Sequence, residues 1–237
     1  MNQLLQYQSL LWEGLWTTVL VTVFGILIAV VVAFVVGFMR LSRHRILRAP
    51  AYVFVEFFRG TSILVQLAWV VYALPFLGVR FTDNLVAGIV VLGLNEGAYA
   101  AEIVRGAIAS RPRGQTEAAV ALGMKPAQRM RRILVPQSIP VMLPSFGNVA
   151  VDLLKATPLV YFIGVADFTA NGLAIRTETQ DTTTILLTLL VVYFILALIL
   201  AAITRWLENR FGLEHRRRGL LRGSPRPVFR PMIGSTS

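Results

Sequence analysis

The sequence predicts an all-α protein that crosses a membrane about five times, and three observations support this fold class. The first is composition: 56% of the 237 residues are hydrophobic and only 15% are charged, against about 25% charged in soluble domains. The second is a set of apolar runs near the roughly 20 residues that a spanning helix needs. The third is that arginines gather between these runs, as they do in cytoplasmic loops.

Five spans are expected along the chain. The first and the fifth are the clearest because neither contains a charged residue. The second joins 18 apolar residues to a preceding stretch that holds Glu56 and Arg59, and the third and fourth also contain charges inside apolar runs. Membrane helices tolerate such interruptions when neighbouring helices satisfy the polar groups. The predicted spans cover residues 15–39, 50–76, 84–108, 138–164 and 182–204.

The arginines set the expected orientation. They gather in the segments after the first, third and fifth spans, which must all face the same side of the membrane. Because positive loops stay in the cytoplasm, we expect the N-terminus outside and the C-terminus inside a bacterial cytoplasmic membrane. The net charge of +11 then reflects insertion and anionic headgroups and does not predict nucleic-acid binding. Residues 1–212 are expected to form one membrane domain, followed by a basic, mobile tail at 213–237.

The segment between the third and fourth spans has its own pattern. Residues 116–122 are strong helix formers, Gly123 suits a left-handed residue just after a helix, and Pro126 can open a second helix. The segment is therefore predicted to be two short helices with a hinge. The first of them would present small and apolar side chains for docking into a groove of another protein.

This segment carries a recognisable signature. Its residues Glu117, Ala118, Ala119, Gly123, Ile133 and Pro136 stand in the register of the "EAA" motif of permease subunits of binding-protein-dependent ABC importers, with Val135 in place of the usual leucine. The blocks "VEFFRGTSILVQL", "LNEGAYAAEIVRGAI" and "LPSFGNVAVDLLKATPL" resemble the polar amino-acid branch of the same family, so the likeness runs from about residue 12 to residue 212.

The resemblance implies a type I importer fold and a set of partners. These would be a dimeric ATP-binding subunit, a second permease subunit of the same or a homologous sequence, an extracytoplasmic substrate-binding protein and the lipid bilayer. The ATPase would be coupled through the 113–125 helix, by way of Glu117, Ala118, Ala119, Leu122 and Gly123. The chain has no phosphate-binding loop. ATP and magnesium are therefore expected in the partner ATPase, and this subunit is not expected to be an enzyme or to hold a cofactor.

Ionisable residues inside the spans indicate where a solute would pass. Glu96 lies roughly 18 Å from the outer end of its span by helical rise, which places it near the midplane. Together with Asp152 it would favour a solute with a positive group, such as a basic amino acid or a zwitterion. The candidate substrate-binding residues are Asn95, Glu96, Tyr99, Asp152 and Thr157. A likeness of "MRRILVPQ" and "FGNVAVDLLKAT" to ectoine and hydroxyectoine permeases points to such a compatible solute.

Other charges in the spans have a structural interpretation. Residues three apart on a helix lie on one face, so we expect Glu56 to pair with Arg59 and Glu102 with Arg105. Lys155 is expected to form a scaffold pair with Asp152.

Three other functions are alternatives to that of an importer permease. A secondary transporter driven by an ion gradient would show an inverted repeat with broken helices, which the sequence does not display. An intramembrane enzyme would need paired metal-ligand histidines or a Ser-His set, and this chain has no cysteine and only two histidines, His44 and His215, both in arginine-rich segments. A subunit that supports a sister permease without touching solute stays open.

Overall fold

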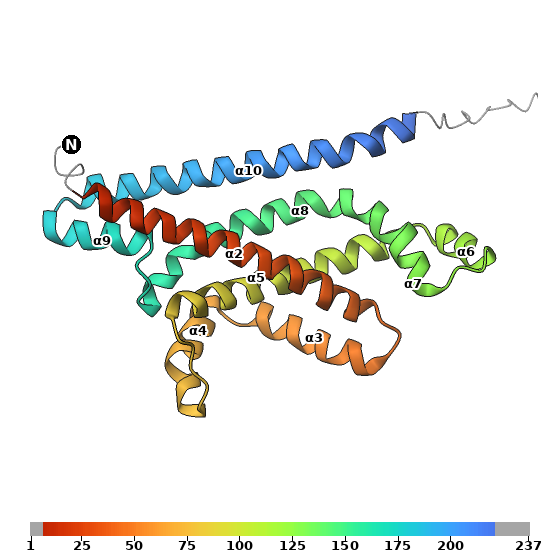
Figure 1. Ribbon diagram of the computed structural model, residues 1–237, viewed down its shortest axis with the longest axis horizontal. Helices are drawn as coiled ribbons and strands as arrows, with labels where there is room; N and C mark the ends of the chain where they lie inside the picture. Colours follow the sequence, from red (N-terminus) through yellow and green to blue (C-terminus); the bar gives the residue numbers. More distant parts are fainter. Residues whose placement is uncertain (1–6, 221–237) are drawn as a thin grey trace, which may run out of the picture.

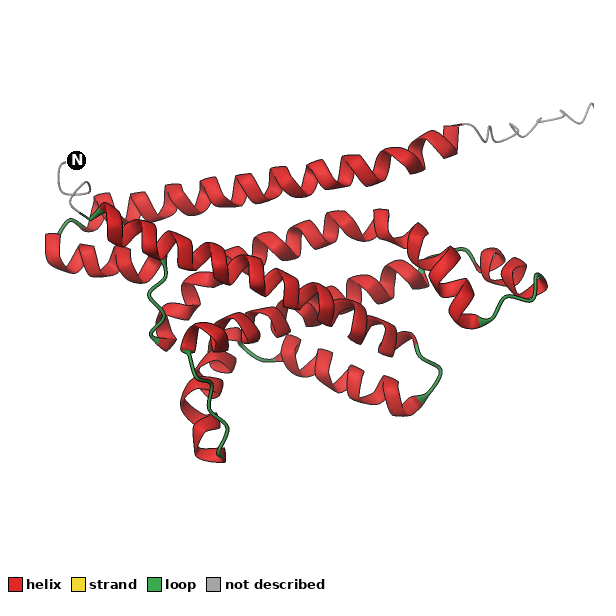
Figure 2. Ribbon diagram, in the orientation of Figure 1, coloured by secondary structure: helices red, strands yellow, loops and turns green. Residues whose placement is uncertain are grey.

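The computed structural model describes residues 7–220, and within them every regular element is helical (Figures 1 and 2). The long elements run nearly side by side, and one short arm leaves the bundle at a steep angle (Figure 1). The α-helices are α2 (Gln8–Leu41), α3 (Arg45–Gly60), α4 (Ile63–Ala68), α5 (Asn84–Ala109), α6 (Arg113–Ala121), α7 (Pro126–Arg129), α8 (Val135–Ala156), α9 (Phe168–Thr179) and α10 (Thr182–Leu220). Short π or 3-10 segments are η1 (Trp69–Ala73), η2 (Leu74–Leu77), η3 (Met130–Leu134) and η4 (Thr157–Ile163).

Four of the helical segments are long and apolar enough to cross a membrane, and a bent pair could supply a fifth crossing. This confirms the predicted class of an all-α membrane protein with about five spans. The fourth span is longer than predicted, because α7, η3, α8 and η4 form one run over Pro126–Ile163. The fifth is also longer, since α10 continues to Leu220. Residues 221–237 of the predicted tail lie outside the described residues.

The predicted second span, near residues 50–76, is broken in the structure and not a continuous helix. The chain forms α3, breaks, and continues as Ile63–Leu77 at an angle of 106° to it. The break occurs because Thr61 and Ser62 adopt extended backbone conformations. The hydroxyl of Thr61 donates to the carbonyl oxygen of Phe57 at 2.7 Å, which satisfies one acceptor at the end of α3.

Two amide side chains hold this break in place. Gln66 Nε2 donates to the carbonyl oxygen of Phe58 at 3.1 Å and to Thr61 Oγ1 at 2.7 Å. Asn95 Nδ2, from α5, donates to the same Phe58 oxygen and to Gln66 Oε1, both at 3.0 Å. Because freed backbone groups at membrane depth need partners within the protein, this amide network is what allows an irregular turn beside α5.

The centre of the bundle is the pair α2 and α5, which pack closely through glycines. A Cβ atom on Gly93 would lie 2.7 Å from the Cβ of Ile28, and one on Gly97 would lie 2.7 Å from the Cβ of Val32. Small residues allow such close approach between membrane helices, where van der Waals contact is a main source of association. The α2–α5 pair therefore sets the frame on which the other helices rest.

We expect Gly97→Ala to lower the free energy of unfolding by about 1–3 kcal/mol, because overpacking forces side chains and backbone to shift. The matched control is Gly106→Ala on the same helix, where an added Cβ has no neighbour within 4 Å. Thermal unfolding in detergent measures both. Equal melting temperatures for the two variants would contradict the tight α2–α5 contact.

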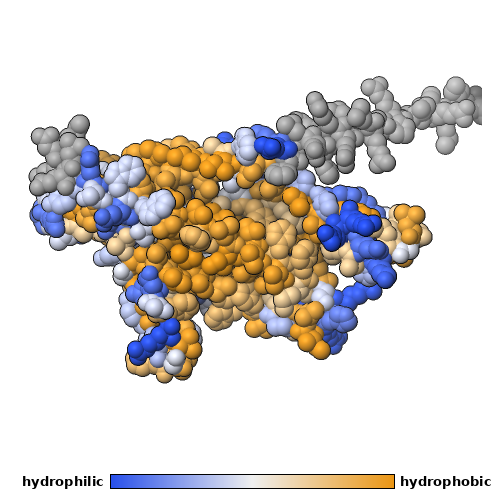
Figure 3. All heavy atoms as spheres, viewed as in Figure 1, coloured by the Kyte–Doolittle hydropathy of each residue, from blue (hydrophilic) through white to orange (hydrophobic). Residues whose placement is uncertain are grey.

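The two ends of the bundle differ in what they gather. The α2–α3 connection, the α6–α7 segment and the C-terminal part of α10 lie at one end, while the start of α2, α9 and the start of α10 lie at the other (Figure 1). An apolar band covers most of the visible face between them (Figure 3). The arginine-rich segments therefore share one end, as the sequence predicts.

Candidate functional site

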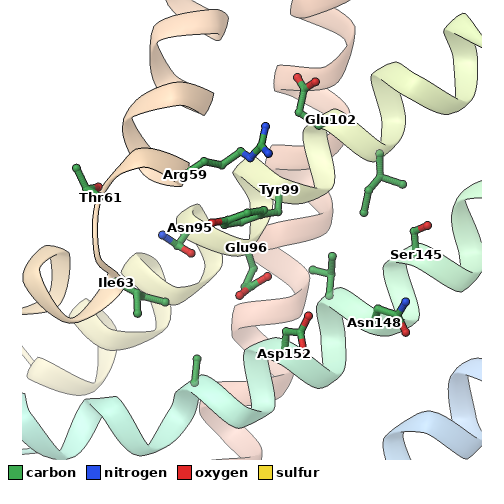
Figure 4. A pocket seen from close by; sticks show the side chains of 13 residues that line it. Arg59, Thr61, Ile63, Asn95, Glu96, Tyr99, Glu102, Ser145, Asn148 and Asp152 are labelled. Carbon is green, nitrogen blue, oxygen red and sulfur yellow. The ribbon is translucent and has the colours of Figure 1, made fainter.

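A cavity of about 690 Å³ opens on the face formed by α3, α5 and α8 (Figure 4). Its walls come from three parts of the chain: the break after α3, the middle of α5 and the middle of α8. Pockets of 300–1,000 Å³ are typical of small-molecule sites. The polar and charged side chains that line it are Arg59, Thr61, Asn95, Glu96, Tyr99, Glu102, Ser145, Asn148 and Asp152.

Two carboxylates face this cavity from opposite walls. Figure 4 shows Glu96 on α5 and Asp152 on α8 directed into the same space. Among the described residues, no salt bridge includes Glu96. Asp152 has one partner, Lys155, whose Nζ lies 3.9 Å from its Oδ1 while both side chains are more than half exposed. Such an exposed pair contributes little, so both acids can accept hydrogen bonds from a positive group.

The cavity also contains a cation, and here the expected pair of Glu56 and Arg59 is wrong. Within the described residues Glu56 forms no salt bridge, and Arg59 instead places its guanidinium carbon 5.3 Å from the centre of the Tyr99 ring. Arg59 lies in the last turn of α3, where its side chain meets Tyr99 of the neighbouring α5 (Figure 4). A cation over an aromatic face is a favourable contact, and it fixes a positive group at one wall.

Asn95 has a different role from Glu96. Its side chain is only 5% exposed, and its amide nitrogen is already committed to the break after α3. It lines the cavity and at the same time holds the wall that carries Thr61. Its contacts therefore determine the shape of the cavity.

Thr157 does not lie in the cavity, which corrects its place among the candidate residues. It is fully buried, and its hydroxyl donates to the carbonyl oxygen of Leu154 at 2.8 Å. The chain changes from α8 to the 3-10 segment η4 at this residue. That change of helical type alters the direction of the side chains, and Thr157 points into the core. Thr61, Ser145 and Asn148 are polar cavity residues that the sequence pattern did not single out.

Glu102 anchors a three-residue charge cluster at one edge of the cavity. Its Oε2 atom lies 2.9 Å from Nη2 of Arg105, and its Oε1 atom lies 3.1 Å from Nη1 of Arg40 on α2. The contact with Arg40 was not foreseen, because the two residues lie far apart in sequence and on different spans. Glu102 is thus neutralised within the chain, which leaves Glu96 and Asp152 as the carboxylates available to a solute.

The expected docking helix is α6, at the end of the bundle that carries the arginines (Figure 1). Glu117 and Ala118 are exposed, and Leu122 is 80% exposed. Ala119 differs, because only 1% of it is exposed, so it packs against its own chain and cannot offer a surface to a partner. This corrects the expectation that all of residues 117–119 face outward.

Gly123 ends α6 in the predicted manner. Its φ angle is +70°, a conformation that glycine adopts without steric cost. Its amide donates to the carbonyl oxygen of Val120 at 2.9 Å, and the amide of Met124 donates to that of Ala119 at 3.0 Å. These two bonds form the Schellman arrangement, which fixes the angle at which the chain leaves α6 and enters α7.

The arrangement suits binding of a small zwitterion. Two carboxylates can receive an ammonium or amidinium group, and the guanidinium of Arg59 can receive a carboxylate. Neutral donors and acceptors from Thr61, Ser145 and Asn148 lie on the same walls. Within the described residues no group of three or more His, Asp or Glu side chains could hold a metal ion.

Comparisons with known proteins show the family to which the chain belongs. Residues 22–213 match the family model described as "Binding-protein-dependent transport system inner membrane component". The chain is 40% identical over 208 residues to the "Probable amino-acid ABC transporter permease protein y4tF" of Sinorhizobium fredii, covering 86% of this chain and 87% of that protein. It is 38% identical over 176 residues to the "Glutamine transport system permease protein GlnP" of Escherichia coli, covering 73% and 80%.

A solved structure is similar over nearly its whole length. The crystal structure of an amino acid ABC transporter with histidines superposes with a TM-score of 0.80 at 31% sequence identity, covering 87% of this chain and 96% of that one. The arrangement of helices around the cavity is therefore shared with a transporter of amino acids.

Proposed function

The chain belongs to the family of binding-protein-dependent transport system inner membrane components, and from that premise we propose that it imports a polar amino acid or related zwitterion. It would act as the permease subunit of an ATP-driven importer in the bacterial cytoplasmic membrane. Transport would proceed by alternating access, with ATP hydrolysed by a separate subunit that binds at α6.

One observation carries the choice of solute class: the cavity holds Glu96, Asp152 and Arg59 on its walls. Charged groups at membrane depth are costly unless they are paired or wet, so they mark solute pathways. Because Glu102 is already paired with Arg40 and Arg105, the remaining acids favour a solute with a positive group. Similar permeases named for glutamine and L-cystine support an amino acid rather than a sugar or an inorganic anion.

The placement of partners follows from the two ends of the bundle. The end with α6 and the arginine-rich segments would face the cytoplasm, because positive loops remain on that side. The ATPase dimer, with its ATP and magnesium, would bind there. The binding protein would dock at the opposite end, near α9 and the start of α2. A second permease, identical or homologous, would complete the assembly.

Uptake by vesicles that contain the chain together with its ATPase and binding protein tests the proposal. Labelled glutamine, arginine and ectoine serve as solutes, and each is measured with ATP, without ATP, and with an imposed sodium or proton gradient. We expect ATP-dependent accumulation of at least one of them, with the others competing according to their charge. Accumulation driven by the ion gradient in the absence of ATP would instead indicate a secondary transporter.

A further inference from the structure

A second cavity, of about 520 Å³, shares no lining residue with the solute cavity and is lined mostly by arginines. It sits where the C-terminal end of α2, the start of α3 and the last turns of α5 meet, at the end of the bundle that carries α6 (Figure 1). Its cationic residues are Arg40, Arg45, Arg48 and Arg105. Three helices thus bring four guanidinium groups to one hollow.

The charges of this cavity are not balanced within the described part of the chain. The only carboxylate in a salt bridge with any of the four arginines is Glu102, which holds Arg40 and Arg105. Arg45 and Arg48 form no salt bridge with the described side chains of residues 7–210, and both are exposed. Four guanidinium groups against one carboxylate leave an excess of positive charge, which an anion would offset.

The inner wall of the cavity is formed by a largely buried arginine and a tyrosine. The side chain of Arg40 is only 12% exposed, and its guanidinium carbon lies 5.0 Å from the centre of the Tyr52 ring. Tyr52 itself lines the cavity and can donate its hydroxyl hydrogen. The hollow therefore has a largely buried cationic wall, a phenol, and an exposed cationic rim formed by Arg45 and Arg48.

The surface beside the cavity is apolar. On α3, Ile46 is 87% exposed, Val53 is 64% exposed and Leu47 is 45% exposed. A free phosphate would use only the arginines, whereas a phospholipid would also cover these side chains with its acyl chains. Basic pockets between spanning helices on the cytoplasmic side bind anionic headgroups.

From this juxtaposition we propose that the cavity lined by Arg40, Arg45, Arg48 and Arg105 binds the phosphate of an anionic phospholipid. The acyl chains of that lipid lie along the exposed apolar face of α3. The site does not depend on the proposed transport activity, since it shares neither Glu96 nor Asp152 with the solute cavity.

Native mass spectrometry of the full chain, purified in mild detergent and titrated with phosphatidylglycerol or phosphatidylcholine, tests this site. The test variant is Arg45→Gln/Arg48→Gln, because these two residues are exposed and hold no partner within the described chain. The matched control is Arg43→Gln/Arg131→Gln, which removes two exposed arginines that do not line the cavity. Thermal unfolding checks that both variants remain folded.

We expect the preference for phosphatidylglycerol over phosphatidylcholine to fall about 30-fold in the test variant and to change little in the control. An equal fall in both variants would mean that the lipid senses general surface charge, and no fall in the test variant would mean that the cavity is not its site. Either result overturns the proposal. Tight binding of inorganic phosphate that phosphatidylglycerol cannot displace would also overturn it, in favour of a soluble phosphate ligand.

Discussion

Replacing Gly123 with proline should reduce ATP-driven uptake by about 100-fold or more, while the membrane bundle stays folded. Proline cannot adopt the φ of +70° found at this position, and it lacks the amide that donates to the carbonyl oxygen of Val120. The end of α6 would lose its angle to α7, so the docking surface formed by Glu117, Ala118 and Leu122 would be misplaced. Co-purification of the ATPase and uptake by vesicles measure the effect.

Two control variants, Gly123→Asn and Gly114→Ala, test whether the loss of uptake comes from the changed angle of α6 or would follow from any substitution in this segment. Asparagine tolerates the left-handed region better than other side chains, so Gly123→Asn should retain most of the uptake. Gly114 lies in the first turn of α6, where an added Cβ meets nothing within 4 Å, so Gly114→Ala should leave uptake unchanged. Reversing the exposed charge with Glu117→Arg should weaken the complex without unfolding α6. A normal ATPase complex in Gly123→Pro would refute the docking role of this helix.

Changing Glu96 to glutamine should lower the apparent affinity for solutes with a positive group by roughly 10- to 100-fold, because a hydrogen bond to a charged group contributes about 1.5–3 kcal/mol. Glutamine keeps the size and one acceptor of the side chain but removes its charge. Uptake of arginine, glutamine and ectoine at several concentrations measures the change in KM for each solute.

Glu56→Gln provides the matched control for this result. Glu56 is exposed, lies outside the cavity and forms no salt bridge among the described residues, so its substitution should leave KM unchanged. Asp152→Asn and the double variant with Glu96→Gln show whether the two acids act on one positive group, in which case their effects are not additive. Unchanged KM for a cationic solute in Glu96→Gln would remove this residue from the transport path.

Local patterns predicted the membrane class and the end of α6 well. Residues 15–39 and 182–204 are apolar throughout, so their helices follow from the cost of leaving backbone groups unpaired in lipid. The position of Gly123 follows from the preference of glycine for positive φ. Both depend on residues that are close together in the sequence, and neither needs knowledge of the tertiary fold.

Contacts between spans could not be predicted in the same way. The pairing of Arg40 with Glu102 joins two helices whose relative rotation no local pattern specifies. The break at Thr61 and Ser62 was missed because the surrounding residues are apolar enough for a continuous span, and the amides that stabilise the turn include Asn95 from another helix. The contact of Arg59 with Tyr99 of α5 is likewise a contact between spans, which the spacing of Glu56 and Arg59 on one helix does not reveal.

The amide network of Gln66 and Asn95 has a mechanical consequence. It joins the oblique segment Ile63–Leu77 to α5 at Asn95, one residue before Glu96. Any rotation of that segment must therefore either break these hydrogen bonds or move the part of α5 that carries Glu96. We therefore expect these parts to travel as a unit during a transport cycle. The cavity would then widen and narrow mainly through movement of α8, with Asp152, relative to the tied unit that carries Glu96.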